Sequence, residues 1–347
     1  MEENKHKRRV HYSGKYPKKF EEKYKELNPE KYAEIVEHVT QKGSTPAGMH
    51  ISIMVQEILD FLQIKPGQQG LDCTLGYGGH TRKMLEKLEG KGCIYGLDID
   101  PIESKKTVER IRNAGFDEEI FKFKLINFAN IDEVAKQAGK FDFVLADLGV
   151  SSMQIDNPER GFSYKIDGPL DLRLDPTHGQ SAAERLQSIT ENEFIGMMID
   201  NSDEPYAEEI AGKVFRLMKK GEKIETTTAL RNAIELALYK LPKDEKEQAV
   251  KKSCARVFQA LRIDVNSEFE VLYSFLEKLP NILNPGGRVA ILTFHSGEDR
   301  LVKKSFKQLA KDGVYSEVSS DVIRPSAEEC RINPRSKSTK MRWAIKA

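Results

Sequence analysis

Alternation of short apolar segments with helical stretches is the feature that most constrains how this chain can fold. Between residues 49 and 151, strand-like runs rich in Val, Ile, Leu and Phe are separated by stretches with helical spacing, such as residues 81–88. Strands separated by helices need crossover connections, which favour a parallel sheet. We predict strands at residues 70–75, 93–97, 121–126 and 141–146.

The strand pattern stops at residue 152 and returns at about residue 256. The later part predicts a helix over 271–283, a turn at Pro285-Gly286-Gly287, a buried strand over 288–294 and a last strand over 339–345. The intervening part predicts only helices, over 182–189, 191–199, 207–218, 228–239 and 245–255. The predicted fold class is therefore α/β, with a Rossmann-like domain and an inserted all-helical domain.

Three parts follow from this pattern. We expect residues 49–151 and 256–347 to form the α/β domain and residues 152–255 to form the helical insertion. Residues 1–48 are a polar, Lys-rich extension, in which Asn28-Pro29-Glu30 predicts the start of one helix.

Charge excludes a strongly basic, histone-like protein, because 55 Lys and Arg residues are offset by 54 Asp and Glu residues. Any nucleic-acid surface must then be a local patch. Basic residues gather at the two ends of the chain, in residues 5–19 and 331–346. Contact with phosphates would explain both groups, and an ordinary solvated surface would explain them equally well.

Cysteine and histidine spacing gives no sign of a metal site or a disulfide framework. The four cysteines include no C-x-x-C pair, and the seven histidines show no H-E-x-x-H spacing, so we predict no metal. No apolar run approaches the roughly 20 residues that a membrane helix needs. The first residues, MEENKHKRR, lack the apolar core of a secretory signal, so we expect a cytoplasmic protein without a membrane partner.

A glycine-rich turn with a distant acid is the first candidate site. Gly76-Tyr77-Gly78-Gly79 lies between a predicted strand and a predicted helix, and Asp98 ends the next strand, 22 residues after Gly76. Such a turn lets a ligand approach the main chain, the helix start offers amides, and the acid can accept hydrogen bonds from ribose hydroxyls. Together they predict a cofactor that contains adenosine.

The glycine spacing favours S-adenosyl-L-methionine over a dinucleotide. The dinucleotide pattern G-x-G-x-x-G would need glycine at position 81, where Thr81 stands. The turn Leu283-Asn284-Pro285-Gly286-Gly287 before a strand is also frequent in methyltransferases. An NAD-dependent oxidoreductase and an ordinary glycine-rich turn are the alternatives.

Taken in order, the motifs resemble those of the RsmH (MraW) methyltransferases, which methylate N4 of a decoding-centre cytidine in small-subunit (16S) ribosomal RNA. The resemblance runs from about His50 to Arg342. Its six blocks are residues 50–57, 72–80, 147–152, 160–163 with 168–173, 258–263 with 265–266, and 294–300. It implies an S-adenosylmethionine-dependent enzyme of rRNA processing with a class I methyltransferase domain. The implied partner is small-subunit ribosomal RNA or the 30S subunit, while the oligomeric state, a homodimer included, stays open.

The resemblance also implies specific cofactor contacts in this sequence. They involve the backbone beside the methionyl part, an acid at the ribose, an aromatic ring at the adenine, and two further positions. In that order they are Gly78, Gly79 and His80, then Asp98, then Phe128, then Asp147 and Gln154.

Some positions depart from the family pattern. Cys73 and Gly297 replace a usual glycine and leucine, which we interpret as packing changes. Pro205, Glu208 and Glu209 stand where the family typically has basic residues. A paralogous S-adenosylmethionine-dependent methyltransferase with another RNA or DNA target is therefore the alternative function, and an RNA-binding module without turnover is a third.

Asp147 is the predicted catalytic residue. The exocyclic amine of cytosine is a poor nucleophile, and an acceptor bonded to it would localise its lone pair. Asp147 ends the fourth strand, beside the expected sulfonium, although it could instead cap the next turn through Ser151 or Ser152.

Three further side chains are weaker candidates. Phe162 and Tyr164 could stack on a base that leaves its helix, since such a base needs a π-surface, but core packing explains them as well. His295, at a strand end, is a second-rank candidate for catalysis or RNA contact.

Overall fold

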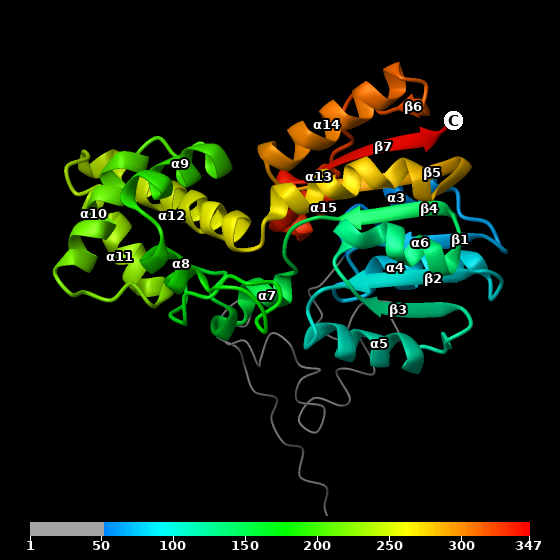
Figure 1. The fold of residues 1–347 in the computed structure, drawn as a ribbon, viewed down its shortest axis with the longest axis horizontal. Helices are drawn as coiled ribbons and strands as arrows, with labels where there is room; N and C mark the ends of the chain where they lie inside the picture. Colours follow the sequence, from blue (N-terminus) through cyan, green and yellow to red (C-terminus); the bar gives the residue numbers. More distant parts are fainter. Residues whose placement is uncertain (1–51) are drawn as a thin grey trace, which may run out of the picture. The chain divides into compact units, whose positions relative to one another are not determined.

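The computed structural model describes residues 52–347, so the predicted extension and its helix from Asn28 lie outside the described residues. A seven-stranded sheet forms the centre, in the order β3-β2-β1-β4-β5-β7-β6 (Figure 1). The strands are β1 Gln69–Asp72, β2 Cys93–Asp98, β3 Phe121–Leu125, β4 Phe141–Asp147, β5 Leu283–Thr293, β6 Tyr315–Val318 and β7 Lys340–Lys346.

Strands β1 to β5 pair in parallel with one another, whereas β7 runs antiparallel to both β5 and β6. The strand order reverses direction at β1 and β4, which are neighbours although β2 and β3 lie between them in the chain. In open parallel sheets, the carboxyl ends of the strands at such a switch point form the ligand crevice. The predicted α/β fold with a Rossmann-like sheet is confirmed.

Helices cover both faces of the sheet because each strand presents apolar side chains on alternate sides. One face packs against α3 Val55–Leu62, α4 Gly79–Leu88 and α5 Glu103–Asn113. The other face packs against α6 Ile131–Ala138, α13 Glu268–Lys278 and α14 Ser296–Lys311 (Figure 1).

Five further helices form a group with a hydrophobic core of their own (Figure 1). They are α8 Ala182–Ser188, α9 Glu191–Ser202, α10 Ala207–Lys219, α11 Thr227–Ala237 and α12 Lys243–Val265. The sequence predicts the last of these only to Ala255. The helix continues for ten residues because Val257, Phe258 and Leu261 extend the buried face into the same core.

Two details of the sheet differ from the expectations. Pro285-Gly286-Gly287 lies inside β5 rather than before it, where the register against β4 is irregular and Gly286 has a φ of 76°. β6 is not predicted, since it has only four residues and only Tyr315 among them is buried.

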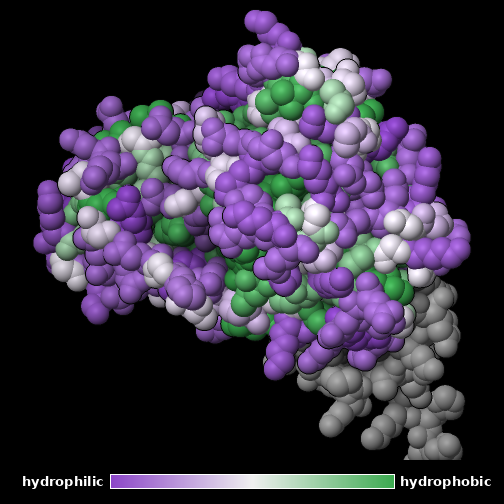
Figure 2. Space-filling view, turned by 45° about the vertical axis from the view of Figure 1, so that its right-hand side comes forward, coloured by the Kyte–Doolittle hydropathy of each residue, from purple (hydrophilic) through white to green (hydrophobic). Residues whose placement is uncertain are grey.

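Hydrophilic side chains cover most of the face drawn in Figure 2, with smaller apolar areas between them. Among residues 52–347, no helix combines the length and the apolar character that crossing a membrane requires.

Candidate active site

The glycine-rich turn and the acid of β2 are joined directly. Oδ2 of Asp98 accepts a hydrogen bond from the Gly76 amide at 2.9 Å, and Oδ1 accepts one from the Asp100 amide at 2.9 Å. The carboxylate therefore fixes the turn after β1 against the loop after β2. This brings the predicted methionyl and ribose positions to one edge of the sheet.

Gly78 needs to be glycine. Its φ is 80°, and a Cβ atom there would lie 2.8 Å from Cγ2 of Thr107. Helix α4 begins at the next residue, and its N-cap residue Gly78 has no side chain to cap the first amides. A helix start of this kind can hold a carboxylate such as that of a methionyl group.

His80 and Asp147 lie side by side at the ends of α4 and β4. Nδ1 of His80 is 3.6 Å from Oδ2 of Asp147, and Nε2 of His80 is 2.8 Å from the Ile53 carbonyl. Oδ1 of Asp147 is buried and has no hydrogen-bond partner within residues 52–347. A buried acceptor without a partner is costly and marks a place where a donor from a ligand would fit.

Asp147 does not cap the turn that follows it. Helix α7, Ser152–Asp156, is capped by Ser151 and Gln154 through a reciprocal pair of hydrogen bonds. The backbone amide of Asp147 donates to Oγ1 of Thr74 at 2.7 Å, which holds the end of β4 against β1. The carboxylate is thus left for another task.

Burial raises the pKa of two acids at this edge. It raises the pKa of Asp98 to about 6, against the lowering effect of the Asp100 and Gly76 amides. It raises the pKa of Asp147 to about 6 as well, where His80 lowers the value and the charges of Asp72 and Glu298 raise it. Acids whose pKa is shifted toward neutral pH are typical of functional sites.

Phe128 lies in the 3₁₀ turn η2 (Phe128–Asn130) that follows β3. Its ring is half-buried and packs edge-on against Phe275, with the ring centroids 5.3 Å apart. Lys278 anchors the turn by donating to the Ala129 carbonyl at 2.7 Å. The structure therefore puts this ring near the end of β3, and its contact with the adenine stays a prediction.

Gln154 points to a network that the sequence did not predict. Its Nε2 donates to Oδ2 of Asp100 at 3.0 Å, and the same oxygen accepts from Nη1 of Arg160 at 2.6 Å. Nη2 of Arg160 also donates to the carbonyls of Arg173 and Leu174. This buried ion pair links the loop after β2 to residues 160–174, which lead into the helical group. The only sequence signal for it was the presence of Arg160 in a matched block.

Phe162 does not have the exposure that stacking on a base requires. It is buried in the core of the helical group, and Tyr164 packs edge-on against Phe258 with the centroids 5.8 Å apart. Core packing, the alternative to the predicted stacking, thus accounts for both rings. Both side chains therefore contribute to the hydrophobic core of the helical group.

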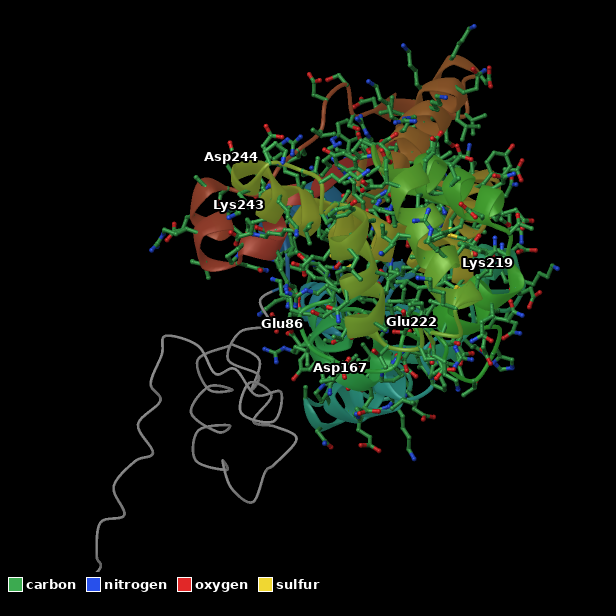
Figure 3. The ribbon with its side chains drawn as sticks, turned by 90° about the vertical axis from the view of Figure 1, so that its left-hand side faces the viewer. Glu86, Asp167, Lys219, Glu222, Lys243 and Asp244 are labelled. Atoms are coloured by element: carbon green, nitrogen blue, oxygen red, sulfur yellow. The ribbon has the colours of Figure 1, made fainter. Side chains whose placement is uncertain are left out.

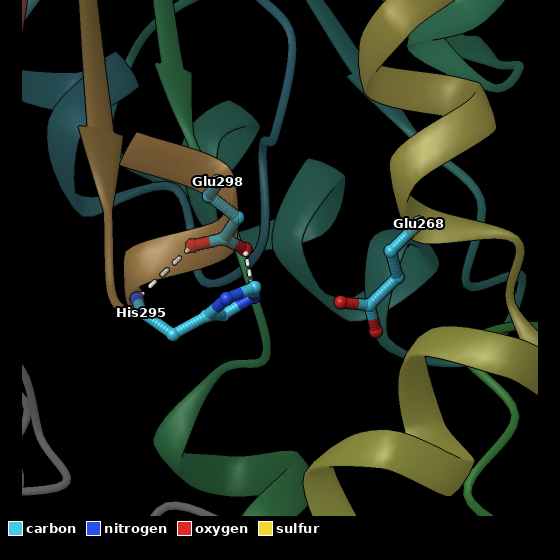
Figure 4. A group of neighbouring side chains, drawn as sticks. All are labelled: Glu268, His295 and Glu298. Carbon is cyan, nitrogen blue, oxygen red and sulfur yellow. Dashed lines mark hydrogen bonds and ion pairs between the residues drawn. The ribbon is translucent and has the colours of Figure 1, made fainter. Parts of the chain in front are cut away.

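His295 belongs to a cluster of titratable side chains with Glu268 and Glu298 (Figure 4). Its Nε2 lies 3.2 Å from Oε1 of Glu298, whose other oxygen accepts from the Phe294 amide at 2.8 Å. The three potential ligand atoms lie within 4.8 Å of one another. However, Arg262 binds both oxygens of Glu268, at 2.8 and 3.0 Å.

The contacts of this cluster form a network that joins two acids to two basic side chains, namely Glu268 to Arg262 and Glu298 to His295. Burial raises the pKa of Glu298, but the hydrogen bond and charge of His295 and the charge of Arg262 outweigh burial and hold it below its usual value. The Arg262 guanidinium already compensates the charge of Glu268 through two hydrogen bonds. The cluster therefore has a structural explanation, and we assign no metal to it.

The basic residues at the C-terminal end are largely paired within the protein. Asp299 accepts from Nε of Arg342 at 2.6 Å and from Nζ of Lys340 at 3.0 Å. Arg335 pairs with Asp156 at 2.7 Å. Phosphate contact by this segment would thus require breaking internal ion pairs, which weakens the expectation of a C-terminal RNA patch.

The strand order with an antiparallel β7, and the glycine turn facing acids at the ends of β2 and β4, define a Rossmann-like class I methyltransferase. The start of α4 behind Gly78, and Oδ1 of Asp147 without a partner among residues 52–347, fit the charged groups of S-adenosylmethionine, the cofactor of this class. The chain belongs to the MraW methylase family, whose model matches residues 47–347.

Two relatives found by sequence support this membership. A protein of Agathobacter rectalis called ribosomal RNA small subunit methyltransferase H 1 is 67% identical over 346 residues, which is 100% of this chain and 99% of that protein. Ribosomal RNA small subunit methyltransferase H of Clostridioides difficile is 38% identical over 314 residues, 86% of this chain and 98% of that protein. Among solved structures, an rRNA methylase from Streptococcus thermophilus is 12% identical with a TM-score of 0.40, over 86% of this chain and 98% of that one.

Proposed function

We propose that this protein transfers the methyl group of S-adenosylmethionine to the N4 amine of a decoding-centre cytidine in 16S ribosomal RNA. The name of the Agathobacter rectalis relative supports the RNA substrate, and the match covers both chains almost completely. The observation that carries the chemistry is the buried Oδ1 of Asp147, which has no partner among the described residues and lies at the end of β4.

S-adenosylmethionine supplies a methyl group on a sulfonium, which is already activated for transfer. The task of the protein is to orient the amine and to accept its proton. We assign both roles to Asp147, whose Oδ1 would accept a hydrogen bond from N4 and so localise the nitrogen lone pair. When the C–N bond forms, the bond between the methyl carbon and the sulfonium sulfur would break and leave a neutral thioether, and the surplus proton on N4 would pass to this carboxylate.

Asp98 would hold the ribose hydroxyls, and this assignment makes a prediction about pH. We expect the affinity for S-adenosylmethionine to fall as the pH drops below about 6, because burial raises the pKa of Asp98 to about 6. Hydroxyl donors favour the ionised carboxylate, so binding releases a proton in this range and tightens as the pH rises.

Calorimetry on the purified protein at several pH values checks this prediction. The variant Asp98→Asn should bind about tenfold or more weakly, since a hydrogen bond to a charged group is worth about 1.5–3 kcal/mol, and its affinity should no longer follow this titration. An affinity in the wild-type protein that stays constant between pH 5 and pH 7 would contradict the assignment.

The alternative function is methylation of another RNA or DNA target, and the charge on the surface of the helical group is the reason for it. Glu208 and Glu209 are exposed in the first turn of α10, where acids stabilise a helix start. Exposed side chains of both signs continue over this group, as Lys219, Glu222 and Lys243 illustrate in Figure 3. Such a surface offers no uniformly basic track for RNA, so a different RNA or DNA target stays open.

The nature of the substrate and the cellular setting are part of this proposal. We infer that the enzyme acts in the cytoplasm on small-subunit ribosomal RNA, either naked or within the assembled 30S subunit. Both forms can be tested with the same purified protein.

The test is methylation of 16S RNA and of 30S subunits from cells that lack N4 methylation, with radiolabelled S-adenosylmethionine as the donor. We expect label in a single decoding-centre cytidine, recovered as N4-methylcytidine after digestion to nucleosides. Preference for one of the two forms identifies the natural substrate. Label at another nucleotide would favour the alternative target, and no label in either form would refute the proposal.

A further inference from the structure

His80 approaches Asp147 in a way that its predicted contact with the cofactor does not require. Its ring is buried, with Nε2 2.8 Å from the Ile53 carbonyl and Nδ1 3.6 Å from Oδ2 of Asp147. A carbonyl can only accept, so Nε2 must carry a proton. In a neutral ring Nδ1 would then turn a lone pair toward a carboxylate, which is repulsive.

We propose that His80 is a positioning residue that holds a second proton on Nδ1, facing Oδ2 of Asp147, and keeps this carboxylate ionised while Oδ1 receives the substrate amine. The inference deepens the proposed function and rests on Asp147 as the acceptor in that function. The 3.6 Å distance allows the contact to tighten when substrate binds, as catalytic hydrogen bonds commonly do.

The surroundings of Asp147 explain why it needs a positive neighbour. Asp72 on β1 and Glu298 on α14 are both buried, and their negative charges raise the pKa of Asp147 further. His80 is the group that lowers it. Thr74 contributes only a hydroxyl, which accepts from the Asp147 backbone amide. Without the charge of His80, burial and two acids would all favour the protonated form of Asp147.

Two variants separate the charge of His80 from its structural bond. In His80→Gln, the side-chain amide can reach the Ile53 carbonyl as Nε2 does, but no positive charge faces Asp147. In His80→Asn, the shorter amide can donate to Asp147 as Nδ1 does, again without a charge. His178→Gln is the matched control, because His178 is largely exposed and pairs with Asp175 in the loop before α8.

The direct readout is the titration of the Asp147 carboxyl, followed by its ¹³C chemical shift in cofactor-free protein and assigned with Asp147→Asn. We expect the midpoint to move upward by about one pH unit or more in His80→Gln, since an opposite charge within 4–6 Å typically shifts a carboxyl by 1–3 units. His80→Asn should also move it upward, by less, and His178→Gln should leave it unchanged. An unchanged midpoint in His80→Gln would overturn the inference.

Methyl transfer gives a second, independent readout. The acid limb of the rate should follow the carboxyl midpoint upward in His80→Gln, because a protonated Asp147 cannot accept from the amine. If the carboxyl midpoint moves in His80→Gln but the wild-type protein does not methylate RNA, the proposed function is refuted and the His80–Asp147 interaction is still supported. A normal acid limb in a folded His80→Gln protein would show that the ring is only structural.

Discussion

Replacement of Asp147 by Asn should lower the rate of methyl transfer by about 10²–10⁴-fold, the usual contribution of a positioned proton acceptor. The amide keeps the shape of the side chain but cannot take a proton from N4. We expect the fold to persist, because the substitution removes a buried charge that faces Asp72 and Glu298. Single-turnover transfer to RNA, measured beside thermal unfolding, checks both statements.

Asp142→Asn is the matched control for this experiment. Asp142 lies on the same strand but at its other end, where its oxygens accept from the Gln69 amide and the Asn284 side chain at 2.8 Å each. It should lose some stability and keep its transfer rate. Wild-type turnover in Asp147→Asn would remove the catalytic role of this residue.

Replacement of Arg160 by Ala should lower the free energy of unfolding by about 3–5 kcal/mol, the range for breaking a buried ion pair. Arg160 and Asp100 are both buried, with their charged atoms 2.6 Å apart, and the substitution leaves the charge of Asp100 uncompensated. It also removes the donors to the Arg173 and Leu174 carbonyls. Urea unfolding followed by circular dichroism measures the loss.

The double variant Arg160→Ala with Asp100→Asn is the control, because it removes both charges together. We expect it to recover part of the lost free energy, since no isolated charge remains buried. A loss below about 1 kcal/mol in Arg160→Ala would mean that this pair behaves like an exposed one. Arg160→Ala should also weaken cofactor binding, because Arg160 holds the side chain of Asp100, whose backbone amide donates to Asp98.

Much of the α/β domain could be predicted from the sequence because its local signals agree with each other. The apolar strands, the glycine turn and the acids at strand ends each follow from one segment of chain. The predicted strand over 141–146 and the observed β4, Phe141–Asp147, differ by one residue. Asp98 and Gly76 come together because neighbouring parallel strands end at the same edge of the sheet.

Long-range pairing could not be predicted in the same way. The Asp100–Arg160 pair joins residues 60 positions apart, and nothing in either segment indicates the other. Arg262 and Glu268 likewise explain the His295 cluster only once the fold brings them together. The end of α12 was missed because a buried face of Val257 and Phe258 looks similar in a helix and in a strand when the run is short.

Helix α12 forms a rigid connection between the helical group and α13. Its 23 residues make an unbroken rod about 34 Å long, at 1.5 Å per residue, and Asn266 and Ser267 alone separate it from α13 on the sheet. A displacement of the helix at Lys243 would therefore tilt α12 as a rigid unit and move its other end, which adjoins α13.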